Sequence, residues 1–165
     1  VLAKEWIEAN VPDGARILMD GMKYRFIQSP PLNPDEATVA RRVDQAEVEG
    51  SDLSRGVSTR ALDLYSKAMT LVSGPRYDLH STVWGLDVRD LSYYLEACFD
   101  YIVTSSVNSH RFAGPSEAAA YPHSATFYRS LPTDPRFEVV YSAVPATWKI
   151  QGPIITVYKV KHSCR

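Results

Sequence analysis

Polar side chains that could bind a ligand gather in one short segment of the chain. They are Ser105, Ser106, Asn108, Ser109, His110 and Arg111. Their hydroxyl, amide, imidazole and guanidinium groups can hold a phosphate group or the hydroxyls of a sugar. We therefore predict a site for a phosphorylated or sugar ligand here. The alternative is that the serines and the asparagine only cap turns, as these residue types commonly do.

The segment directly before these residues predicts a buried strand. The run from Phe99 to Val103 is short and rich in β-forming residues, and small hydroxyl residues follow it. Such a run is typical of a strand that is buried on both faces. Upstream of it, Val88, Leu91, Leu95 and Cys98 fall on one helical stripe. A helix that leads into a buried strand is the repeating unit of an α/β sheet.

The remaining patterns extend this unit into one domain. Helices are expected up to residue 10, over 33–49, 53–72 and 124–131, and from Asp87 or Asp90 to about residue 98; strands are expected over 16–20, 77–83, 137–144 and 154–160, and a long loop over 107–122. This order predicts a three-layer α/β/α sandwich with a mostly parallel sheet of about five strands. The last two strands have no helix between them, which predicts an antiparallel hairpin at the sheet edge.

In such sheets ligands bind beyond the carboxyl ends of the strands. Three segments are expected there, over residues 20–24, 82–86 and 105–111. They add three side chains to the candidate ligand site: Asp20, Lys23 and Trp84. An aromatic ring such as that of Trp84 can stack on a sugar ring, although rim packing is the alternative interpretation.

Several function classes are disfavoured. A net charge of −1 with dispersed basic residues argues against a nucleic-acid partner. The first strand runs into Asp20-Gly21-Met22-Lys23-Tyr24, without the glycine-rich turn of dinucleotide sites, so no cofactor is expected. The chain has no Gly-x-Ser-x-Gly elbow. Its four histidines lack ligand-like spacing, so no metal site is predicted. A histidine could pair with Ser105 or Ser106, but any domain of this size offers such pairs, so no catalytic residue is predicted.

The two cysteines are interpreted separately. Cys98 lies on the apolar stripe and is expected to be a small buried hydrophobic residue. Cys164 is the penultimate residue. A disulfide between them is the alternative.

Three stretches together resemble one protein family. The stretches are Ala3-x-x-Trp6-Ile7-x-x-Asn10-x-Pro12-x-Gly14-x-x-Ile17, then Asp100-Tyr101-Ile102-Val103-Thr104-Ser105-Ser106 with Arg111 shortly after, and Gly152-Pro153-Ile154-Ile155-x-Val157-Tyr158. They resemble the C-terminal soluble domain of membrane glycosyltransferases of the glycosyltransferase C superfamily. Within that superfamily the likeness is to proteins similar to dolichyl-phosphate-mannose-protein mannosyltransferases and aminoarabinose transferases. The segment from Met22 to Gly50 has no counterpart in this resemblance.

The resemblance implies a parent protein with many transmembrane helices before Val1, of which this chain is a fragment. That parent transfers a sugar from a polyprenyl-phosphate donor, and this domain sits outside the cytoplasm, in the periplasm or on the outer face of the membrane. The family's catalytic residues lie in the membrane part, so none is carried over to this chain. The domain is then a non-catalytic accessory. Its implied partners are the transmembrane part of its own chain and a glycan or lipid-linked sugar. The alternative is an independent α/β domain that binds a phosphorylated or sugar ligand at the strand ends.

Overall fold

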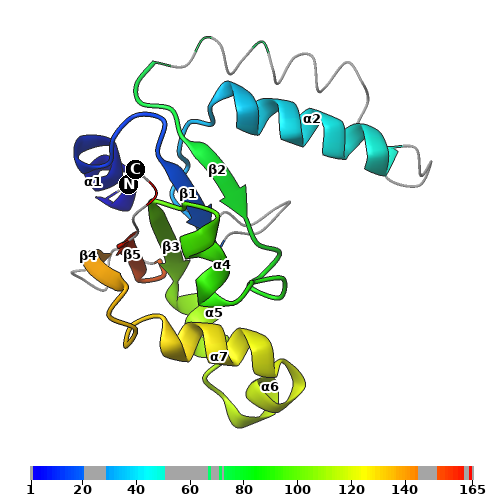
Figure 1. The fold of residues 1–165 in the computed structure, drawn as a ribbon, viewed down its shortest axis with the longest axis vertical. Helices are drawn as coiled ribbons and strands as arrows, with labels where there is room; N and C mark the ends of the chain where they lie inside the picture. Colours follow the sequence, from blue (N-terminus) through cyan, green and yellow to red (C-terminus); the bar gives the residue numbers. More distant parts are fainter. Residues whose placement is uncertain are drawn as a thin grey trace.

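A five-stranded sheet forms the centre of the computed structural model, which describes residues 2–20, 29–50, 67, 71, 73–144, 152–161 and 164 (Figure 1). The strands lie in the order β2-β1-β3-β5-β4. Their bounds are β1 Arg16–Met19, β2 Asp78–Ser81, β3 Tyr101–Ser105, β4 Phe137–Ala143 and β5 Ile155–Val160. The predicted α/β class and the predicted number of strands are thus confirmed.

The sheet is parallel in its first part and antiparallel in its second. β1 pairs in parallel with both β2 and β3. β5 runs antiparallel to β3 on one side and to β4 on the other, with an irregular register between Val139 and Tyr141. The antiparallel C-terminal pair is therefore confirmed, with β4 as the edge strand and β5 next to β3. Because β1 is central among the parallel strands, its carboxyl end lies between those of β2 and β3.

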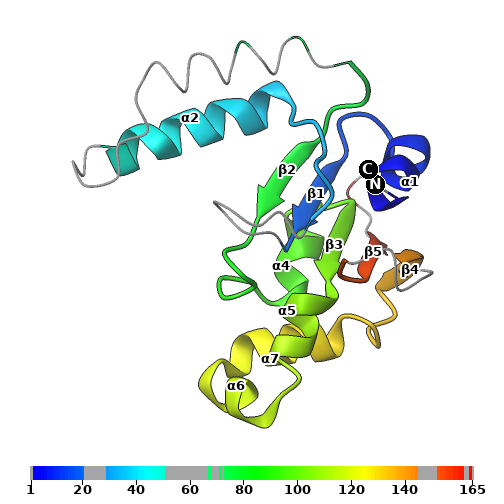
Figure 2. The same cartoon turned by 180° about the vertical axis from the view of Figure 1, so that it is seen from behind.

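The described residues form six helices. They are α1 Leu2–Asn10, α2 Glu36–Gly50, α4 Leu91–Glu96, α5 Ser106–Arg111, α6 Pro115–Ala120 and α7 Pro122–Ser130. Of these, α1 packs against one face of the sheet, and α4 and α7 pack against the other. In Figures 1 and 2, α2 extends sideways from β2, whereas α5, α6 and α7 gather at the end toward which β1 and β2 point. The predicted helix over 53–72 lies outside the described residues, apart from Lys67 and Leu71.

Side-chain alternation along β3 divides the core between the two faces. Ile102 packs into a cluster with Tyr94 of α4 and Phe127 of α7. Val103 points the other way, into a cluster with Ile7 of α1. All five residues of β3 are buried, as the apolar run predicted. Burying each such apolar side chain contributes roughly 1.5–3 kcal/mol, so β3 stabilises both clusters.

The loop predicted over 107–122 is wrong, because α5 and α6 occupy most of it. Both helices have only six residues and carry no sustained apolar stripe, so periodicity could not reveal them. Their start signals are local. Ser105 Oγ accepts a hydrogen bond from the Val107 amide at 3.3 Å, and Pro115 occupies the first position of α6.

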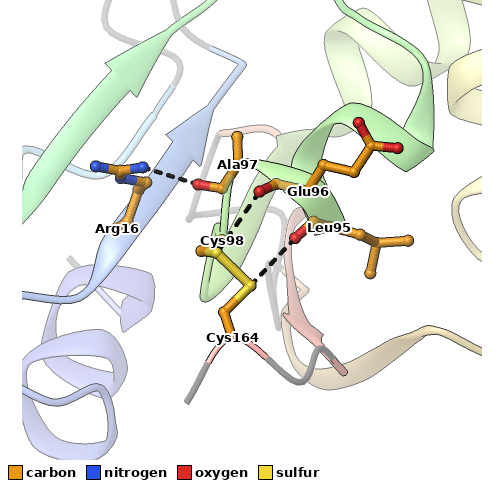
Figure 3. The surroundings of a disulfide bond; sticks show 6 residues. All are labelled: Arg16, Leu95, Glu96, Ala97, Cys98 and Cys164. Atoms are coloured by element: carbon orange, nitrogen blue, oxygen red, sulfur yellow. Dashed lines mark hydrogen bonds between the residues drawn. A yellow bond between two sulfur atoms is a disulfide. The ribbon is translucent and has the colours of Figure 1, made fainter.

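The interpretation of Cys98 as a small buried hydrophobic residue is also wrong. Cys98 is half-buried in the turn between α4 and β3, with a φ of 54°, and it forms a disulfide with Cys164 (Figure 3). The two Cα atoms are 5.9 Å apart, within the usual range for a disulfide. The adjoining turn is held to β1, because Arg16 Nη1 donates to the Ala97 carbonyl at 2.8 Å. The disulfide thus ties the end of the chain to the start of β3.

Candidate functional site

Asp20 connects the carboxyl ends of β1 and β3. It directly follows β1, and only 1% of its surface is exposed. Its Oδ1 atom accepts hydrogen bonds from the Ser105 amide at 3.1 Å and from Asn108 Nδ2 at 3.0 Å. Asn108 Nδ2 also donates to the Asp20 carbonyl oxygen at 3.0 Å. The structure therefore brings together Asp20, Ser105 and Asn108, three of the residues that the sequence nominated.

The second oxygen of this carboxyl group lies near the Tyr128 hydroxyl. Neither Asp20 Oδ2 nor the Tyr128 hydroxyl has a well-formed hydrogen bond to any described residue, although both atoms are buried. The two groups are nonetheless close enough to shift each other's pKa. Burial raises the pKa of Asp20 from 3.8 to about 7, against the lowering effect of the hydrogen bonds from Ser105 and Asn108 and of the nearby Tyr128 hydroxyl. Burial and the nearby Asp20 raise the pKa of Tyr128 as well.

The end of β2 reaches the same place through Gly85. A Cβ atom on Gly85 would overlap the Tyr128 hydroxyl, and the φ of Gly85 is +69°. Its amide donates to Thr82 Oγ1 at 3.2 Å, and the Thr82 amide donates to the Met19 carbonyl at 3.0 Å. Residues that follow all three parallel strands thus meet around Asp20 and Tyr128.

A partly open cavity of about 230 Å³ lies beside this cluster. Its walls combine side chains from β3, α5, α7 and β5: Thr104, Ser106, Ser109, His110, Tyr128, Leu131, Ile154, Thr156 and Tyr158. Three of the nominated residues, Ser106, Ser109 and His110, line it. The sequence analysis missed the threonines and tyrosines of the walls. The signal that could have found those on the strands is the alternation of side chains between the two faces of the sheet. Thr104 pairs with Thr156 and Ile102 with Tyr158 on the neighbouring strands β3 and β5.

Arg111 and Trp84 are not among the residues that line the cavity. The guanidinium group of Arg111 lies over the rings of Phe112 and Tyr121, at 5.2 and 5.7 Å from their centroids. Trp84 is partly exposed in the connection between β2 and α4, with a φ of 59° that is rare for a bulky residue. Lys23 lies outside the described residues.

The serine hydroxyls also serve the backbone. Ser105 caps α5, so the alternative interpretation as a turn cap holds for this residue. Ser106 Oγ accepts from the Ile154 amide at 3.0 Å, which joins α5 to the start of β5. A hydroxyl that accepts a backbone bond still has its proton to donate, so Ser106 keeps one donor for a ligand.

A separate charged cluster lies at the opposite end of the sheet. Asp78, the first residue of β2, accepts from Arg16 Nε of β1 at 2.7 Å and also from Arg41 of α2. Burial acts to raise the pKa of Asp78, but the hydrogen bonds from Arg16 and Arg41 outweigh it and hold that pKa below its usual value. This cluster attaches α2 to the sheet and lies away from the cavity.

Comparisons of the chain with protein-family models, curated proteins and solved structures found no match. Across the described part of the chain, no helix combines the length and the apolar character needed to cross a bilayer. The same residues contain no group of three or more histidine, cysteine or acidic side chains placed to hold a metal ion.

Proposed function

We propose that this chain is an extracytoplasmic accessory domain of a polytopic membrane glycosyltransferase that uses a polyprenyl-phosphate sugar donor. The observation that carries the proposal is where the three resembling stretches lie in the fold. They supply α1 with β1, then β3 with the start of α5, and finally β5. β1, β3 and β5 are consecutive in the sheet, so stretches far apart in the sequence form one continuous structural unit.

The disulfide supports the location outside the cytoplasm. Disulfides form and persist in oxidising compartments such as the periplasm and the cell surface, whereas cytosolic thiols are kept reduced. Cys98 and Cys164 are paired in the folded chain, and Cys164 lies at the surface. Such a bond fits a domain that folds after export.

The proposal is tested by the coding region that precedes Val1. Several hydrophobic segments of about 20 residues each are expected there, because the parent must span the membrane repeatedly. A soluble coding region without such segments would overturn the proposal. Thiol alkylation at the moment of cell lysis adds a second test, in which Cys98 and Cys164 should resist labelling until a reductant is added.

The second candidate is an independent α/β domain that binds a phosphorylated or sugar ligand at the carboxyl ends of the strands. The cavity beside Asp20 and Tyr128 favours it, since it lies where ligands bind in open α/β sheets. A thermal-shift screen against nucleotides, sugars and sugar phosphates tests this candidate. Saturable stabilisation by one of these compounds is expected, and a flat response to all of them would contradict it.

A further inference from the structure

The cavity beside β3 has walls of two kinds. Leu131 and Ile154 are apolar, whereas Thr104 and Thr156 present hydroxyls from adjacent strands. The tyrosine side chains of α7 and β5 combine an aromatic ring with a hydroxyl. Ligand sites of this type bind molecules that are apolar on one side and rich in hydrogen-bonding groups on another. A pyranose ring has such surfaces, with C–H groups on its faces and hydroxyls around its rim.

The charges around the cavity disfavour an anion. Among the described residues that line the cavity there is no lysine or arginine. Arg111, which the sequence offered for a phosphate, lies over two aromatic rings instead. Asp20 lies behind Tyr128 and carries a negative charge once it ionises. Phosphate sites typically rely on arginine, lysine or converging backbone amides.

Two buried polar atoms lie next to the cavity. Asp20 Oδ2 and the Tyr128 hydroxyl are both more than nine-tenths buried by residue, and neither has a well-formed hydrogen bond to a described residue. Buried polar atoms in folded proteins are nearly always paired, so an orphan usually marks a place for water or a ligand. Tyr128 belongs both to this pair and to the cavity wall. A ligand in the cavity therefore lies next to this pair.

We infer that the cavity at the end of β3 binds an uncharged, hydroxyl-rich ligand the size of one sugar ring and discriminates against its phosphorylated counterpart. The volume of about 230 Å³ fits this size, since it lies below the roughly 300–1,000 Å³ of sites for drug-sized ligands. This inference rests on the second candidate function, that the strand ends form a ligand site, and it names the ligand class.

The test is a set of matched NMR titrations at pH 8 on the ¹⁵N-labelled protein. Glucose, mannose, galactose and N-acetylglucosamine are each compared with the corresponding 6-phosphate. At least one neutral sugar should shift the amides of Ser106, Ser109 and Thr156 in a saturable way, and its phosphate should bind at least tenfold more weakly. If the phosphate binds as tightly or more tightly, the inference fails while the binding function stands. If no compound gives saturable shifts, both fail.

Two variants locate the binding in the cavity. Tyr128→Phe removes the orphan hydroxyl and keeps the ring, so it should weaken sugar binding at least threefold without lowering the melting temperature. Tyr121→Phe is its matched control, because Tyr121 is exposed and does not line the cavity. Thr156→Val removes a wall hydroxyl at nearly constant volume and should also weaken binding, with exposed Thr126→Val as control. Unchanged affinity in both cavity variants would overturn the inference.

Discussion

Reduction of the Cys98–Cys164 disulfide should destabilise the domain substantially. The bond joins residues 66 positions apart. In the chain-entropy model, closing a loop of this length removes roughly 15 cal/mol/K from the unfolded chain, or about 4 kcal/mol at 25 °C. Measured effects are usually about 2–4 kcal/mol because native strain offsets part of the gain. The positive φ of Cys98 is one source of such strain, so we expect a loss of about 3 kcal/mol.

The assay is equilibrium urea unfolding, followed by tryptophan fluorescence with and without reductant. With a slope of about 2 kcal/mol/M, a loss of this size moves the midpoint down by about 1.5 M urea. The double variant Cys98→Ser with Cys164→Ser is the control. It should unfold like the reduced wild type and should not respond to reductant. A midpoint shift below about 0.5 M, with complete reduction verified by mass spectrometry, would refute the loop-closure estimate.

Three further predictions concern the strand ends and the charged cluster opposite them. Burial raises the pKa of Asp20 from 3.8 to about 7, so between these pH values the folded state keeps a proton that the unfolded state has lost. The free energy of unfolding should therefore fall by about 3 kcal/mol as the pH rises from 4 to 7. Asp20→Asn should flatten that slope in urea unfolding at several pH values, and an unchanged slope would contradict the assignment. Gly85→Ala should cost about 2 kcal/mol or more, because its methyl group meets the Tyr128 hydroxyl. Gly14 also has a positive φ but no neighbour close to the position of a Cβ atom, so Gly14→Ala should lower the free energy of unfolding by only about 1 kcal/mol. Equal losses of stability in the two variants would argue against the steric contact at Gly85. Asp78→Ala removes the carboxylate that pairs with Arg16 and Arg41, and it should lower the free energy of unfolding by about 2 kcal/mol. This loss is smaller than for a fully buried ion pair because both arginines are partly exposed. The exposed pair of Glu138 and Lys161 provides the control, since Glu138→Ala should change stability by less than about 0.5 kcal/mol.

The parts of the fold that the sequence predicts are those with a local apolar signal. β3 stands out because its residues are buried on both faces, and α7 because Phe127, Tyr128 and Leu131 recur at helical spacing. The α/β pattern then places the ends of β1 and β3 together, which is how Asp20 and Asn108 were nominated. The hydrogen bond between Asp20 and Asn108 depends on the arrangement of the strands in the sheet, since the two residues belong to different segments of the chain.

The missed features have no local signal. The pairing of Cys98 with Cys164 depends on the antiparallel course of β5 along β3. It also depends on the positive φ of Cys98, which places this residue in the turn after α4 and not on the helix. The role of Tyr128 was hidden because an inward tyrosine on a helix is normally core. Only the packing of α7 over the ends of the strands brings its hydroxyl to Asp20 and Gly85.

The proposal of an extracytoplasmic domain is tested most directly by the side of the membrane on which Cys164 lies. Intact cells that express the parent protein would be treated with a membrane-impermeant reductant and then with an impermeant maleimide, with Cys98→Ser and the double variant Cys98→Ser with Cys164→Ser as controls. The proposal predicts that Cys164 is labelled in intact cells only after reduction. Labelling that requires permeabilised cells, or that needs no reductant, would contradict it.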